Sequence, residues 1–176
     1  MGRIRSAWEI ALEKTQDIEI DEEKYRQETL LKEGMSLAGK YLNNPEMSYE
    51  QLEKDYSEGK KTGVVRTIFS NLGLPQDNSY KMRFERLCEV VNLVDVTGRA
   101  GQVMQQTGQF FEQYLQARED FANRMQEELR MQMEQNPETV NSAQYAKLIE
   151  QNLKKMESQY SEALENSKTM LREILG

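Results

Sequence analysis

The sequence of 176 residues predicts an all-α protein with a helical head and a coiled-coil-like stalk. Apolar residues recur at helical spacings along most of the chain, no useful length of strand-like alternation occurs, and there are only three prolines. We expect an N-terminal head, residues 1–97, packed on a long helix that begins within it. That helix and the C-terminal helix then form an antiparallel two-helix hairpin, residues 98–176.

Local signals place the helices of the head. Ser6 and Glu9 form a capping box that predicts a short helix from Ser6 to about Thr15, although Gly2 with Ser6 also matches the N-myristoylation pattern. A second helix is expected over residues 21–42, ended by "NNP". A second capping box, Ser48 with Gln51, opens another helix. After "EGKKTG", the stretch "VVRTIFSNLGLP" predicts a further helix that stops at its Gly-x-Pro.

The long helix is predicted over residues 79–135, and three glycines in it need an explanation. Gly98, Gly101 and Gly108 fall on the same stripe as its apolar residues. We favour a continuous helix that another helix crosses closely at these small residues. The alternative is a local break around Gly98–Gly101, since glycine is a poor helix former.

Helix lengths indicate which segments pack together. At 1.5 Å per residue the long helix would span roughly 85 Å and the last helix, after "NPE" at 136–138, roughly 57 Å. The last helix therefore covers the long one only from about Gly98 onward. We expect Phe111 or Leu115 to contact the region from Tyr160 to Leu164, and the N-terminal helices to cover residues 79–97.

Composition excludes most enzyme chemistry. With no histidine and a single cysteine, Cys88, the chain cannot form a Ser-His-Asp or Cys-His arrangement, nor an imidazole or multi-thiolate metal site. We therefore predict a protein that is not an enzyme, with no catalytic residue, no cofactor and no metal. No run approaches the roughly 20 apolar residues of a membrane span, and one cysteine suits a reducing compartment, so no membrane contact and a cytoplasmic location are expected.

Charge is distributed unevenly. The chain carries a net charge of −7, but residues 59–86 hold six basic and two acidic side chains. The protein as a whole should repel nucleic acid, while this basic island leaves a contact with RNA or phosphate open. Its candidate contacts are Lys60, Lys61, Arg66, Lys81, Arg83 and Arg86. The competing interpretation is helix surface with compensation of helix C-terminal dipoles.

Apolar residues in the stalk predict self-association. Phe110 and Phe111 point about 100° apart on a helix, so one paired helix cannot cover both. Met131 and Met133 also point in different directions near the stalk end. We expect a two-fold homodimer that uses the stalk or the region near the glycines. The alternative is that the N-terminal helices fold down and bury these apolar side chains within one chain. The candidate contacts are Gly98, Gly101, Gly108, Phe110, Phe111, Met131 and Met133.

The opening "IRSAWEIALEKTQDIEIDEEK" and the following "EGMSLAGKYL" resemble the start of small all-helical bacterial proteins in a family of unknown function. The resemblance covers about the first 45 residues and implies a bacterial cytoplasmic protein without a known activity. The leading hypothesis is a non-enzymatic protein–protein interaction or scaffold protein with an unidentified partner. An RNA- or phosphate-binding regulator that uses the basic island is the alternative.

Overall fold

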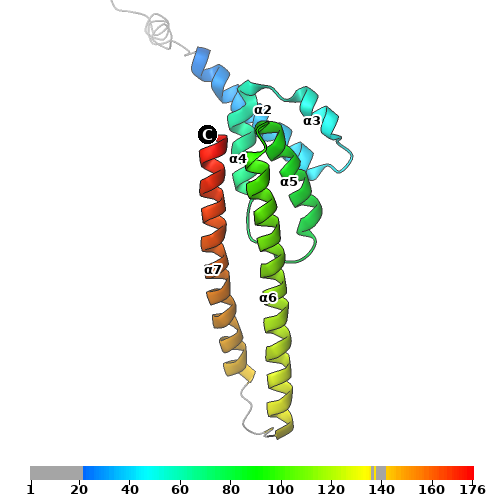
Figure 1. The fold of residues 1–176 in the computed structure, drawn as a ribbon, viewed down its shortest axis with the longest axis vertical. Coiled ribbons are helices and arrows are strands. Elements are labelled where there is room, and N and C mark those ends of the chain that lie inside the picture. The colour runs from blue at the N-terminus through cyan, green and yellow to red at the C-terminus, as the bar shows by residue number, and fades with distance from the viewer. Residues whose placement is uncertain (1–21, 136, 138–141) are drawn as a thin grey trace, which may run out of the picture.

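The computed structural model describes residues 22–135, 137 and 142–176, and the regular structure in this part of the chain is helical (Figure 1). The helix predicted from Ser6 to about Thr15, and two residues of the "NPE" turn, 136 and 138, lie outside the described residues. The elements, in chain order, are α2 (Glu22–Asn43), α3 (Tyr49–Asp55), the 3₁₀ turn η1 (Glu58–Lys60), α4 (Lys61–Asn71), α5 (Tyr80–Val94), α6 (Arg99–Gln135) and α7 (Ser142–Leu175).

Local signals predicted the start of α3 and the end of α4 correctly. The Gln51 backbone N–H donates to Ser48 Oγ at 3.2 Å, and the Ser48 N–H donates to Gln51 Oε1 at 3.1 Å, which completes the capping box. Helix α4 ends at Asn71, just before Gly73 and Pro75. These boundaries depend on local chemistry alone.

The prediction of one continuous helix over residues 79–135 is wrong. The chain breaks between α5 and α6, where Gly98 has a φ of 78°, in the left-handed region that favours glycine. Asp95 closes the turn, because its Oδ1 accepts from the Thr97 N–H at 3.0 Å and its Oδ2 from the Ala100 N–H at 2.7 Å. The break around Gly98–Gly101 is thus the correct alternative.

Because of this break, α5 folds back and packs along α6. The rings of Tyr80 and Phe84 meet Phe111 edge-on, at centroid distances of 5.7 and 5.4 Å. A Cβ on Gly108 would lie 3.0 Å from the Phe84 ring, and one on Gly101 would lie 2.6 Å from Asn92 Oδ1. Two of the three glycines therefore make room for side chains of α5, and Gly98 makes the turn.

The closest helix crossing lies elsewhere, between α2 and α4. A Cβ on Gly34 would collide with the carbonyl oxygen of Lys60, and one on Gly63 would collide with that of Leu31. Only glycine fits at these two positions, because the neighbour is backbone that a side-chain rotation cannot move. The close crossing predicted for the long helix is therefore found inside the head.

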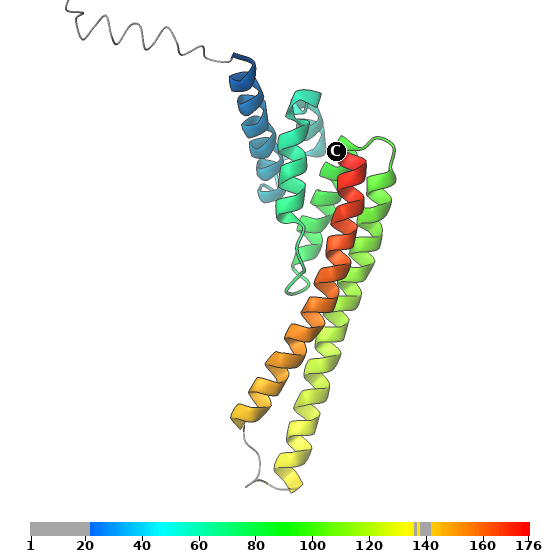
Figure 2. The same ribbon diagram turned by 90° about the vertical axis from the view of Figure 1, so that its left-hand side faces the viewer.

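The hydrophobic core extends across the predicted boundary at 97/98. It combines apolar side chains of α2, α4 and α5 with Ala100, Val103 and Met104 of α6. Helix α7 contributes its C-terminal half, including Leu164 and Leu171. The first part of α6 and the last part of α7 thus belong to the packed head, and the remainder forms the projecting stalk (Figure 2).

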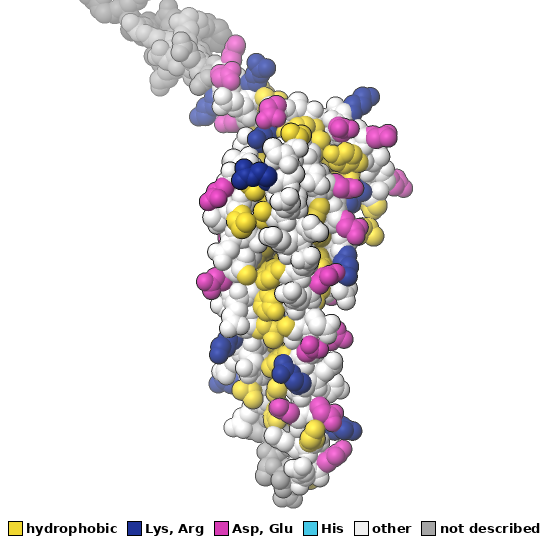
Figure 3. Space-filling view, viewed as in Figure 1, with side chains coloured by type: hydrophobic (Ala, Val, Ile, Leu, Met, Phe, Trp, Pro, Cys, Tyr) yellow, Lys and Arg dark blue, Asp and Glu magenta, His cyan; other side chains and the backbone are white. Residues whose placement is uncertain are grey.

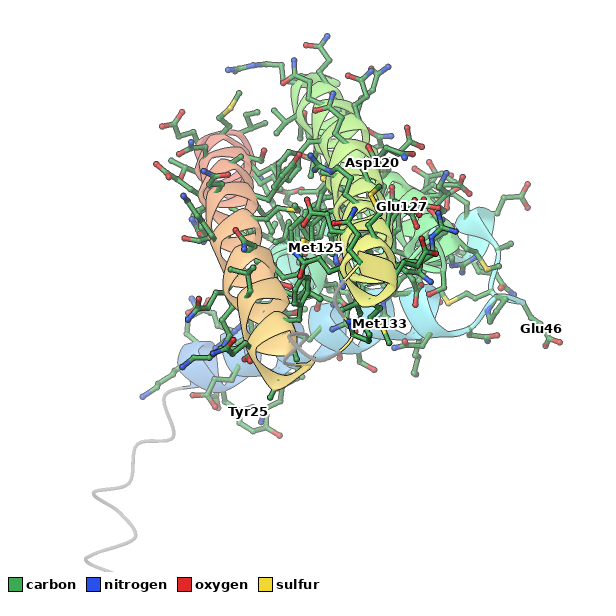
Figure 4. All side chains as sticks on the ribbon, turned by 90° about the horizontal axis from the view of Figure 1, so that it is seen from below. Tyr25, Glu46, Asp120, Met125, Glu127 and Met133 are labelled. Atoms are coloured by element: carbon green, nitrogen blue, oxygen red, sulfur yellow. The ribbon has the colours of Figure 1, made fainter. Side chains whose placement is uncertain are left out.

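The antiparallel hairpin of α6 and α7 is confirmed. Its ring contacts are Phe110 and Tyr114 on Tyr160, at centroid distances of 5.2 and 4.9 Å, whereas Phe111 turns toward α5. The two helices are aligned as predicted, but the residues in contact with Tyr160 are Phe110 and Tyr114 rather than their neighbours Phe111 and Leu115. Toward the stalk end the two helices diverge, and Met125, between α6 and α7, is the last buried side chain of α6 (Figures 2 and 4).

Replacement of Asp95 by alanine should lower the free energy of unfolding by about 1 kcal/mol at pH 7. Hydrogen bonds from Thr97, and then from the Ala100 N–H, hold the pKa of Asp95 below its usual value. Since the folded pKa is the lower one, the carboxylate stabilises the fold at neutral pH, and this contribution is lost as the pH falls below about 4 through the folded pKa. Urea unfolding of both proteins at pH 7 and pH 3 measures this. A difference that is as large at pH 3 as at pH 7 would contradict the assignment.

Candidate functional site

The lysines of the basic island pair with carboxylates of the same chain. Lys60 Nζ donates to the Asp55 carbonyl oxygen at 2.9 Å and lies 3.5 Å from the Glu33 carboxylate. Lys81 Nζ lies 3.2 Å from Glu112. Lys61 lies 3.9 Å from Glu58. These are largely surface pairs, which contribute little to stability but offset the positive charge.

Two arginines of the island bind α5 to the end of α2. Arg86 donates from Nε to the Tyr41 carbonyl oxygen at 2.8 Å and from Nη2 to the carbonyl oxygens of Asn44 and Met47, at 3.0 and 2.9 Å. Its guanidinium lies 3.8 Å from the centre of the Tyr41 ring. Arg83 bonds to Asn43 at 2.9 Å. This is the cation expected at a helix C-terminus, where carbonyl oxygens lack partners.

Arg86 thus acts as a clamp between α5 and the end of α2. Next to it, the Tyr41 hydroxyl donates to the Glu89 carboxylate. Burial, followed by Glu89, raises the pKa of Tyr41 to about 12, so the phenol stays protonated as a donor. Burial likewise raises the pKa of Cys88 to about 11, which keeps the thiol protonated and poorly nucleophilic at neutral pH. Within the described residues, Arg66 is the one member of the island without a partner in the chain, and it is exposed.

The two phenylalanines that predicted self-association are covered by two different helices of the same chain. Phe111 is buried under α5, and Phe110 is half-buried against Tyr160 of α7. Met131 and Met133 remain exposed at the stalk end, at 47 and 56%. The phenylalanines therefore no longer require a second copy to cover them, and the methionines stay available to one.

A polar groove of about 580 Å³ lies where the loop between α4 and α5 meets α6 and α7. Among its charged groups, Arg118 donates to the Gln76 carbonyl oxygen at 3.1 Å, and Lys81 pairs with Glu112. The described residues contain no group of three or more His, Cys, Asp or Glu placed to hold a metal ion. Among the described helices, none is long and apolar enough to cross a membrane.

One side of α7, which we call the open face of α7, is not covered by the other described helices. It follows steps of three and four residues, so its members share one side of the helix. Side chains on it are exposed or half-buried, with Leu148 and Met170 exposed at 48 and 46%. Its positions are Tyr145, Leu148, Asn152, Met156, Gln159, Ala163, Asn166, Met170 and Ile174.

No charged residue lies on the open face, although α7 carries ten elsewhere on its surface. Figure 3 shows this side of the molecule, with apolar and uncharged side chains mainly along the middle of the α6–α7 pair and charged ones toward the edges. The partner contacts predicted from the sequence lie in or just before α6, and none of them lies on α7. The positions of the charges on a helical wheel are the signal that identifies it.

Residues 57–173 match a family of unknown function, DUF6657. The chain belongs to this family. The DUF6657 match runs from the end of the α3 region through nearly all of α7 and so includes the open face. The expected membership of a family of unknown function is confirmed, while the residues that carried the resemblance precede the DUF6657 match. Neither a curated protein nor a solved structure matches the chain.

If Arg86 is a structural clamp in this DUF6657 protein, its replacement by glutamine should lower the free energy of unfolding by about 1–3 kcal/mol, because three carbonyl oxygens lose a charged donor. Arg66→Gln is the matched control, with an expected change within about 0.5 kcal/mol. Urea denaturation measures both. Equal effects of the two substitutions would remove the distinction between clamp and free surface cation.

Proposed function

We propose that the protein is a non-enzymatic interaction protein that binds a helical partner through the open face of α7. The observation that supports this proposal is a side of α7, from Tyr145 to Ile174, that is free of charge and lies outside the packed core for most of its length. Solvated helix faces of soluble proteins are ordinarily polar and charged. An uncharged face with exposed Leu148 and Met170 is typical of a surface that another helix covers.

The shape of the open face supports a helix, rather than a small molecule, as the partner. The open face is a long, narrow strip of one helix, and α7 with its 34 residues is about 51 Å long. A second helix laid along the strip fits this form better than a small molecule, which needs a concave pocket. Methionine adapts to the shape of an apolar partner, and the exposed Met131 and Met133 extend the apolar surface at the stalk end.

The non-enzymatic part of the proposal rests on the side chains available. The sequence has no histidine, and its one thiol has a raised pKa. Binding of RNA or phosphate by the basic island has weaker support, since five of its six side chains have partners in the chain.

Photo-crosslinking from single positions in the full-length protein, expressed in its own cells, tests this function. A crosslinking amino acid at Leu148 or at Met170 should give one or a few discrete adducts. The matched controls carry it at Lys147 or Thr169, which are exposed neighbours on the charged side of α7, and these should give little. An adduct of twice 20.6 kDa identifies a second copy, and any other discrete mass identifies a different protein. The absence of adducts at both open-face positions, or equal yields at the controls, would contradict the proposal.

A further inference from the structure

The partner of the open face can be specified from its own sequence. We infer that it is α7 of a second copy, packed antiparallel about a two-fold axis at Gln159. This inference rests on the proposed function, and it adds the identity, direction and register of the partner. Isologous contacts of this kind require a surface that is complementary to itself.

The open face meets this requirement when it is reversed about Gln159. Tyr145 then lies within one residue of the level of the partner's Ile174, and Leu148 lies level with the partner's Met170. Closer to the axis, Met156 lies within one residue of the level of the partner's Ala163, so on the open face a long side chain faces a short one. Large against small is the arrangement that lets two helices interdigitate without voids.

Polar positions also match. Asn152 lies opposite the partner's Asn166, and Gln159 lies opposite its own copy. Asn152 Nδ2 already donates to the Leu148 carbonyl oxygen at 2.9 Å, which leaves its Oδ1 to accept from the amide of the partner's Asn166. Paired amides of this kind fix the register of a helix pair, because any shift would leave them opposite apolar side chains.

Charges beside the open face select the antiparallel direction. Lys155 and Glu162 flank it, both exposed, and neither forms an ion pair within the described chain. In the antiparallel register Lys155 lies beside the partner's Glu162, and symmetry repeats the pair. A parallel pairing in register would instead place the flank with Lys155 and Glu162 beside the opposite flank of the partner helix, so the two residues would lie on opposite sides of the interface and could not pair.

The fold leaves space for this arrangement. Helix α7 is unobstructed over its length in Figures 1 and 2, and α2 and α4 of the head lie to one side of the α6–α7 pair. Reversal about Gln159 brings the stalk part of one copy alongside the head part of α7 in the other. The two heads then lie at opposite ends and do not compete for the same space.

A disulfide tests the two-fold axis. In a Cys88→Ala background, Gln159→Cys should oxidise to a covalent dimer of twice 20.6 kDa, because a residue on the axis meets its own copy. Ser158→Cys, the adjacent exposed position on the charged side of α7, is the control and should crosslink at least tenfold more slowly. Light scattering of the unmodified protein should give the dimer mass at micromolar concentration.

A charge exchange tests the direction. Glu162→Lys should weaken dimerisation about tenfold, since it converts two attractive pairs into two repulsive ones. Lys155→Glu should do the same, and the double variant K155E/E162K should restore the affinity of the unmodified protein. Lys147→Glu, on the far side of α7, should leave it unchanged. Sedimentation equilibrium measures all four.

A mass of 20.6 kDa at every concentration, or equal crosslinking from positions 158 and 159, would overturn the antiparallel dimer. So would a double variant as weak as the single ones. If the protein is monomeric while Leu148 and Met170 still crosslink to a different protein, the dimer fails and the proposed function stands. If neither association occurs, both fail.

Discussion

The contact between the backbones of α2 and α4 at Gly34 and Gly63 is the constraint on which the head depends. The two helices meet without side chains between them, so their separation and angle are fixed by backbone geometry. The other side of α4 then presents Val64 and Ile68, both fully buried, to the rest of the core. The end of α7 packs there too, with Arg172 5.1 Å from the centre of the Phe69 ring.

This placement divides the surface of α7 into three parts. One part, with Leu164, Leu171 and Leu175, is buried in the core. A second carries the charged residues and faces solvent. The open face is the third part, and it stays uncovered because α6 and the head approach α7 from the other directions (Figures 1 and 3). The candidate interaction surface is therefore a consequence of how the head is assembled.

Sequence reasoning succeeded where the determining interaction is local and failed where it is not. The capping box at Ser48 and the stop before Pro75 involve neighbours in the chain. The break before α6 depends on hydrogen bonds to the Asp95 carboxylate, which the spacing of apolar residues does not reveal. The glycines that follow fit the apolar stripe equally well whether the helix is continuous or broken. The partners of Arg86 are carbonyl oxygens about 40 residues away. Gly34 and Gly63 are ordinary weak helix positions until the two helices are known to cross.

Alanine at Gly34 and alanine at Gly39 of the same helix provide the most direct comparison for the central role of this crossing. Gly39 has open space around its Cβ position, whereas a Cβ on Gly34 meets the Lys60 carbonyl oxygen. Urea unfolding should show Gly34→Ala destabilised by about 1–3 kcal/mol, from overpacking against backbone, and Gly39→Ala stabilised by up to about 1 kcal/mol, from helix propensity. Equal free energies of unfolding for the two variants would contradict a head built on backbone contact between α2 and α4.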